Sequence, residues 1–256
     1  MDVFSQRLEQ EHGAQVITTT PSVPYKVKVR GERAKREFRG EETIITNPSS
    51  WPDPCNIVET SEPYVIGTII TPDIYLGDVI GLCHSRRGVQ LSTRNLDATR
   101  ILMQYKLPMN EIVVDFYDIL KSLSSGYATF DYEEMGFESS HLVKLDILLN
   151  GRAVPELSTI IHASQARALA KKICEKLKDV LPRQLFQIAI QAAVGAKILA
   201  RTNIQAVRKD VLSKCYGGDI TRKMKLLKHQ AEGKKRMKMY GNIEVPRETF
   251  INILKR

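Results

Sequence analysis

EPYVIGTIITPDIYLGDVIGLCHSRRG, residues Glu62–Gly88, carries two secondary-structure signals in a single run. Its first ten residues are mostly β-branched, aromatic and small, which predicts a strand. Pro72 and Asp73 are typical of a helix start, and Gly88 after two arginines is typical of a helix end. We therefore expect a strand that leads directly into a helix.

The residues after Gly88 extend this pattern. In chain order we expect a turn-rich piece (Val89–Thr99), a strand (Arg100–Pro108), a helix (Asn110–Gly126) and two extended pieces (Tyr127–Glu133 and His141–Gly151). We assign residues 61–150 to the β-α-β-β-α-β supersecondary plan of ferredoxin-like domains.

The flanking sequence differs in character. Residues 1–31 predict a short amphipathic helix and two extended segments, and residues 32–60 predict a charged, then Pro/Ser/Asn-rich linker or irregular segment. Residues 151–256 predict a second, mixed α+β domain. Its helix covers Ser164–Leu181, its alternating segment Leu185–Ala200 favours a strand but leaves a helix open, and a further helical pattern ends at Gly217–Gly218.

The charge is concentrated at one end of the chain. The whole sequence of 256 residues has a formal net charge of +9. Ala196–Arg256 holds 16 Lys/Arg and 5 Asp/Glu, whereas the residues before it hold 22 basic and 24 acidic side chains. Segregation of this kind indicates an interaction surface for a polyanion.

Nothing in the sequence indicates catalysis or metal binding. The four cysteines are scattered without a C-x-x-C pair, which excludes the usual zinc spacing and suggests no disulfide framework. The histidines have no acid or nucleophile at a useful spacing. We predict no catalytic, cofactor-binding or metal-ligating residues, and we expect Cys174 and Cys215 to be buried apolar groups.

The most basic segment runs from Lys214 to Tyr240. Asp219 is a candidate helix cap, and Ile220, Met224, Leu227 and Ala231 form a narrow apolar stripe by which the helix would dock, with Gly233 as its end. The candidate phosphate-binding residues are Lys214, Arg222, Lys223, Lys225, Lys228, Lys234, Lys235, Arg236 and Lys238.

Three interpretations of this segment are open: a solvated surface, a grip on RNA phosphates, or a helix lying on an anionic membrane. The stripe is narrow for a membrane and lacks Trp and Phe. Only Tyr216 and Tyr240 interleave with the cations, which argues against base stacking and for recognition of folded RNA by shape and backbone. We favour RNA. Arg86 and Arg87 are further candidates, although cations at a helix end also offset its dipole.

Two groups of segments resemble a known family. The fifth domain of elongation factor G is similar to two segments, IYLGDVIGLCHSRRGVQ and LPMNEIVVDFYDILKSLSSGYATFDYE. The C-terminal domain of LepA (elongation factor 4) translational GTPases is similar to three further segments: LPRQLFQIAIQAAVGAKILAR, VRKDVLSKCYGGDITRKMKLLKHQAEGKKRMK and GNIEVP. The sequence of these segments is similar to that of the mitochondrial LepA branch. The first 30 residues are similar to the later portion of domain III of that family.

The resemblance implies a function and partners. It implies a ribosome- and tRNA-binding part of a translation factor whose full-length relatives promote back-translocation of tRNA and translational fidelity using GTP. It also implies contact with large-subunit rRNA and proteins, a location in the mitochondrial matrix and peripheral association with the inner membrane. No small-molecule substrate is expected.

The family's nucleotide-binding domain has no counterpart in this sequence. No G-x-x-x-x-G-K-[ST] string occurs; AEGKKR is the nearest and lacks both the preceding glycine and the Ser/Thr for Mg²⁺. We therefore expect no enzyme activity from this chain, with GTP and Mg²⁺ bound only in full-length relatives, and we expect a fragment, short isoform or incomplete gene product. The alternatives are a stand-alone basic RNA-binding module and a GTPase whose site has no recognisable motif.

Overall fold

The computed structural model describes residues 7, 8, 10–13, 21–38, 40–208, 210, 220–240 and 243. These residues divide into two compact units that meet between Leu142 and Val143, and each unit is described by itself. Arg7, Leu8 and Gln10–His12 are helical, in agreement with the helix expected near the start. The extended segment expected at Val16–Thr20 lies outside the described residues.

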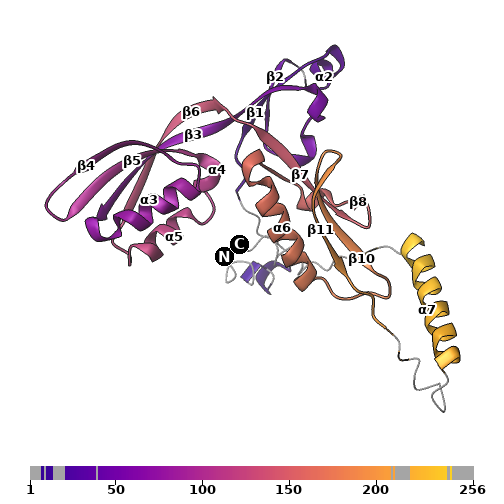
Figure 1. Cartoon of the computed structure of the whole chain (residues 1–256). Helices are drawn as coiled ribbons and strands as arrows, with labels where there is room; N and C mark the ends of the chain where they lie inside the picture. The colour runs from indigo at the N-terminus through magenta and orange to yellow at the C-terminus, as the bar shows by residue number, and fades with distance from the viewer. Residues whose placement is uncertain are drawn as a thin grey trace. The chain divides into compact units, whose positions relative to one another are not determined.

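The first unit is a six-stranded antiparallel sheet with helices (Figure 1). Its elements are β1 (Tyr25–Val29), α2 (Glu32–Glu37), β2 (Glu42–Ile45), β3 (Ile57–Pro72), α3 (Leu76–Ser85), β4 (Val89–Asn95), β5 (Arg100–Pro108), α4 (Met109–Ile112), α5 (Phe116–Leu123) and β6 (Thr129–Ser139). The segment β3-α3-β4-β5-α5-β6 has the predicted βαββαβ order, with spatial order β6-β3-β5-β4. The expectation of an α+β chain with a ferredoxin-like unit is confirmed.

Strand β3 organises this sheet because it pairs with three other strands. Its first part pairs with β1, from Ile57 to Ser61, and its later part pairs with β5, from Tyr64 to Pro72. Its other edge pairs with β6 from Ser61 to Ile70. Helices α3 and α5 cover one face, where Val79 and Phe116 are fully buried against Ile69 and Met103 of the sheet.

Helix α3 ends in a turn that brings an arginine into the left-handed backbone region. Arg87 has a φ of 59°, its N–H bonds the carbonyl of His84 at 3.1 Å, and the Gly88 N–H bonds the carbonyl of Cys83 at 2.8 Å. These two bonds form a Schellman motif, in which the left-handed position usually holds glycine. A Cβ at Gly88 would lie 2.7 Å from the Cys83 carbonyl oxygen, so no other residue fits there without a shift.

Three expectations for this half of the chain were wrong. Residues 32–60 are not only a linker, because β2 pairs with β1 and Trp51 is buried against Tyr25. The turn-rich piece after Gly88 contains β4, a strand exposed on both faces that, among the described strands, pairs with β5 alone. The last predicted strand of the ferredoxin-like unit, β7 (Leu142–Leu149), pairs in the second sheet instead.

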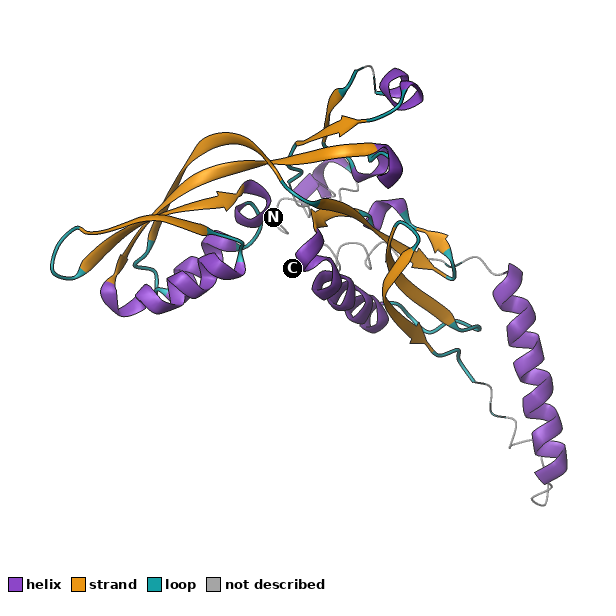
Figure 2. Ribbon diagram, turned by 45° about the horizontal axis from the view of Figure 1, so that its top comes forward, coloured by secondary structure: helices purple, strands orange, loops and turns teal. Residues whose placement is uncertain are grey.

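The second unit is a smaller antiparallel sheet with one long helix on it (Figure 2). Besides β7 its elements are β8 (Arg152–Ala153), β9 (Thr159–His162), α6 (Ala163–Val180), β10 (Ile188–Val194), β11 (Lys197–Ile204) and α7 (Ile220–Tyr240). The sheet order is β11-β10-β7-β8, with β9 beside β7. The helix expected at Ser164–Leu181 is confirmed as α6, and the segment from Leu185 forms the hairpin β10–β11, so the strand alternative was right. The helical pattern expected from Ile204 to Gly218 is wrong at its start, because Ile204 ends β11 and residues 205–208 are not helical; most of the rest lies outside the described residues.

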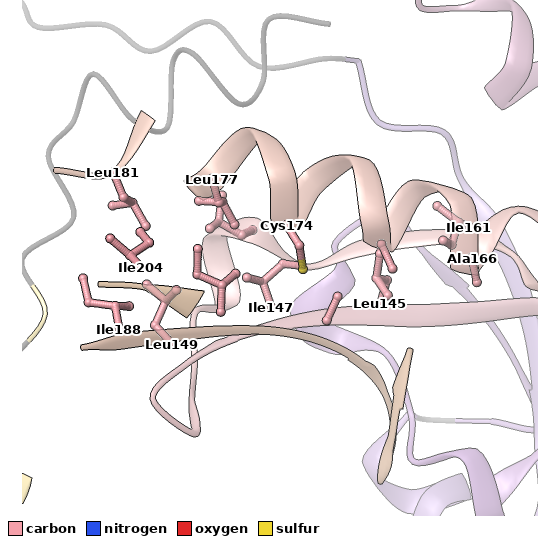
Figure 3. Close-up of a cluster of buried hydrophobic side chains, with 14 of the residues drawn as sticks. Leu145, Ile147, Leu149, Ile161, Ala166, Cys174, Leu177, Leu181, Ile188 and Ile204 are labelled. Atoms are coloured by element: carbon pink, nitrogen blue, oxygen red, sulfur yellow. The ribbon is translucent and has the colours of Figure 1, made fainter. Parts of the chain in front are cut away.

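The core of the second unit is the layer between α6 and the sheet (Figure 3). Cys174 and Leu177 of α6 face Ile147 of β7, and Ile188 of β10 is fully buried in the same cluster. Burial raises the pKa of the Cys174 thiol to about 11, so it stays protonated near neutral pH and behaves as a small apolar group, as expected from the sequence.

Gly88→Ala should destabilise the first unit by about 1–3 kcal/mol, because the new methyl group would force the helix end and Leu107 apart. Gly81→Ala in the same helix is the matched control, since nothing lies within 4 Å of its Cβ position, and it should be neutral or stabilising by up to about 1 kcal/mol. Urea denaturation followed by the fluorescence of Trp51, the single tryptophan, measures both. Equal midpoints for the two variants would contradict the geometry of this turn.

Candidate nucleic-acid interface

Helix α7 is one continuous helix from Ile220 to Tyr240 (Figure 1). The expectation that Gly233 ends the helix was wrong. Nothing lies within 4 Å of the Cβ position of Gly233, and its neighbours Glu232, Lys234 and Lys235 are good helix formers. One glycine costs a helix only about 1 kcal/mol relative to alanine, so the favourable neighbours carry the helix through it. The helix is about 30 Å long at the usual rise per residue.

The charge on α7 is almost entirely positive. It carries eight of the nine cations predicted from the sequence: Arg222, Lys223, Lys225, Lys228, Lys234, Lys235, Arg236 and Lys238. Glu232 is its one acid. Lys223 and Lys234 are half-buried, and the other six are exposed. The ninth, Lys214, lies outside the described residues.

These cations have few compensating partners among the described residues. Lys234 Nζ donates a hydrogen bond to the carbonyl of Val207 at 2.6 Å. No carboxylate of the described chain forms an ion pair with Lys225, Lys228 or Lys235. Like charges spaced three or four residues apart on a helix repel one another, and a polyanion would relieve that repulsion. The helix is therefore an electrostatically favourable site for phosphate.

The apolar stripe of α7 is exposed. Ile220, Met224 and Leu227 have 75%, 63% and 38% of their surface accessible. The expectation that this stripe docks the helix is therefore wrong for the described part of the protein. Helical periodicity shows which side of a helix is apolar, but it does not show whether another element covers that side.

Arg86 and Arg87, the other predicted RNA-binding residues, contact carboxylates. The Arg87 guanidinium donates to both oxygens of Glu62, at 2.8 and 3.0 Å, and its Nε lies 3.4 Å from Glu111 Oε1. Arg86 Nη1 lies 3.6 Å from Glu111 Oε2. Glu62 is 1% exposed, and the Arg87 side chain is 16% exposed. The structure gives both arginines a structural role, and their contact with RNA stays a prediction.

Glu62 also contacts Ser140, which follows β6 near the end of the first unit. The Ser140 hydroxyl, directly after β6, donates to Glu62 Oε1 at 2.6 Å, and the Ser140 N–H donates to the carbonyl of Thr60 at 2.8 Å. The Thr60 hydroxyl donates in return to the Ser140 carbonyl. The roles of Glu62, Glu111 and Ser140 were not predicted from the sequence. The available signal was an acid at the start of the apolar segment Glu62–Thr71, because a charge must find a partner when it is buried.

The other candidate chemistries find no support in the described residues. Burial raises the pKa of the Cys83 thiol to about 12, which makes it a poor nucleophile. Within the described ranges no three His, Cys, Asp or Glu side chains converge to hold a metal ion. None of the described helices is both long and apolar enough to cross a membrane.

Comparison with known families gives two matches, which divide at 148/149, whereas the compact units divide at 142/143. Residues 59–148 match the model of the elongation factor G C-terminus, and residues 149–255 match the C-terminus of the GTP-binding protein LepA. The two matches together cover residues 59–255, and the chain belongs to the LepA-type translation factors as their C-terminal part.

Individual relatives agree with this assignment. The chain is 58% identical over 255 residues to the mitochondrial translation factors GUF1 of Homo sapiens and Bos taurus, and 56% identical over 257 residues to the mitochondrial translation factor waclaw of Drosophila melanogaster. These alignments cover all of this chain but only 38%, 38% and 37% of the relatives. The chain thus spans less than two-fifths of the relatives' length.

Arg87→Met should destabilise the first unit by about 3–5 kcal/mol, because it leaves the buried Glu62 carboxylate without its charge partner. Adding Glu62→Gln should recover a large part of the loss, since the remaining amide is neutral and its oxygen still accepts from Ser140. Arg86→Met, which removes one long contact from a carboxylate that keeps its contact with Arg87, should cost clearly less than Arg87→Met. Urea midpoints read from Trp51 compare the three variants. A double variant less stable than Arg87→Met would contradict the buried-pair account.

Proposed function

We propose that this chain is the ribosome- and tRNA-binding part of a LepA-type translation factor, in which α7 grips folded RNA through its phosphates. The observation that carries the proposal is the helix itself: eight Lys/Arg against one Glu along a single helix of about 30 Å. Each phosphate that a cation neutralises releases condensed counterions, so the affinity is independent of base sequence and falls steeply with salt.

The composition of α7 favours folded RNA over unpaired strands. Proteins that bind single strands place aromatic rings between their cations so that bases can stack. Tyr240 is the only aromatic residue of α7 and lies at its last position. A rigid cationic rod without stacking platforms fits the phosphate backbone of a structured RNA such as tRNA or rRNA.

In this proposal the two units bind different partners. The elongation factor G-like unit docks on the large ribosomal subunit, and the LepA-type unit contacts tRNA. This chain binds without hydrolysing GTP; GTP-driven back-translocation and control of fidelity belong to full-length factors of the family. The names of the relatives support action in mitochondria.

A second candidate function is supported by the exposed stripe of Ile220, Met224 and Leu227. A cationic helix with exposed apolar side chains can lie on an anionic bilayer, which would give peripheral membrane association. Binding to vesicles with and without anionic lipid tests this separately. If vesicle binding needs the stripe whereas tRNA binding does not, the helix serves two partners.

Neutralising Lys225, Lys228, Lys235 and Arg236 to Gln should weaken binding to tRNA and to ribosomes at least about tenfold at roughly 0.1 M salt, because up to four phosphate contacts are lost. Glutamine is a good helix former, so α7 should persist, which circular dichroism verifies. Fluorescence anisotropy with labelled tRNA and co-sedimentation with ribosomes measure binding.

The matched control neutralises four exposed cations of the same unit outside α7, namely Arg167, Lys172, Lys178 and Arg183. It changes the net charge by the same amount and should change the tRNA affinity much less. If both variants lost the same affinity for tRNA, net charge alone would explain the loss, and the assignment of RNA binding to α7 would be wrong.

A further inference from the structure

Strand β6 is a long edge strand with one free side. It pairs with β3 along its whole length, and no other described strand pairs with it (Figure 1). Its outer N–H and C=O groups are therefore available to another chain, although the Tyr132 N–H already donates to Asp131 Oδ1 at 2.9 Å. Between Thr129 and Glu134 its register with β3 is uninterrupted; a bulge follows, where Gly136 has a φ of 111°.

Large side chains are exposed along this edge. Tyr132 and Met135 are each 49% accessible and Phe137 is 36% accessible, while Tyr127 just before the strand is 70% accessible. Singly exposed apolar residues are ordinary on a protein surface, but here several follow one another on one edge strand. An added strand would cover them together with the free backbone groups.

The charge of β6 restricts what can bind. The strand contains Asp131, Glu133, Glu134 and Glu138 and no Lys or Arg, in a chain whose net charge is +9. Glu138 forms an ion pair with Lys106 of β5. Asp131, Glu133 and Glu134 are exposed and form no ion pair with any described residue.

We propose that the free edge of β6 is a docking site for an extended, Lys/Arg-rich segment of a partner protein, which adds as a strand. Backbone hydrogen bonds would supply affinity, and the three unpaired carboxylates would supply selectivity for a basic sequence. RNA is excluded because its phosphates would be repelled. A second copy pairing β6 with β6 is disfavoured because acids would face acids across the new ladder. The site is independent of α7 and of the RNA-binding proposal.

A simpler role for the acids is protection, since charged residues on an edge strand prevent pairing with any other strand. The two roles predict different results. A purely protective edge binds no strand of either charge, whereas a docking edge binds a basic strand and rejects an acidic one.

The test uses the whole chain and a short peptide of alternating lysine and valine as probe, with a peptide of alternating glutamate and valine as control. Amide hydrogen exchange followed by mass spectrometry should show protection of residues 129–139 with the basic peptide only. The triple variant Asp131→Lys/Glu133→Lys/Glu134→Lys should bind the basic peptide at least about tenfold more weakly, because attraction becomes repulsion.

The matched control is Asp53→Lys/Glu156→Lys/Asp179→Lys, which reverses three exposed acids outside β6 and should retain the affinity to within about twofold. The tRNA affinity of the β6 variant serves as an independent check, because it should not fall. Peptide binding without protection of β6, or equal losses in both triple variants, would overturn the proposal. So would a dimer whose β6 amides are protected without peptide, since the occupant would then be a second copy.

Discussion

The first unit depends on the burial of one carboxylate. Glu62 lies in β3, the strand that pairs with β1, β5 and β6, and is 1% exposed. A buried carboxylate is tolerable only with a charge partner and further hydrogen bonds. The partner is Arg87, which reaches Glu62 because the end of α3 holds its backbone in the left-handed region. The contacts of Glu62 thus fix three parts of the first unit: strand β3, the end of helix α3 and Ser140 after β6.

This constraint explains why the role of Arg86 and Arg87 in the fold was not predicted from the sequence. Two arginines before a glycine are expected either to offset a helix dipole or to project towards an anion. The structure shows a third role, because the carboxylates that bind them come from β3 and α4, far away in sequence. Glu62 alone suggested such pairing, and nothing local in the sequence identifies the partner of a buried charge.

Much of the fold was predictable where the pattern is long and local. The strand β3, the helix α3 and the helix α6 combine clear periodicity with recognisable ends, and all were predicted. The strand β4 was missed because it is exposed on both faces and is held by backbone bonds to β5, so its side chains carry no alternation. The strand β7 was assigned to the wrong sheet because its register with β10 is a long-range property. The cations of α7 were predicted as residues, whereas the helix through Gly233 and the exposed stripe were not.

The described chain carries opposite charges on separate features, an acidic edge on the first unit and a basic helix on the second. For a translation factor this arrangement suits an environment made of RNA and basic protein. The most direct test of the central claim is the salt dependence of tRNA binding. If α7 grips phosphates, log Kd should rise linearly with log salt concentration with a slope of roughly 0.7–0.9 per contact, and the four-residue Gln variant should have a clearly smaller slope. An affinity that is the same at low and high salt would contradict the account.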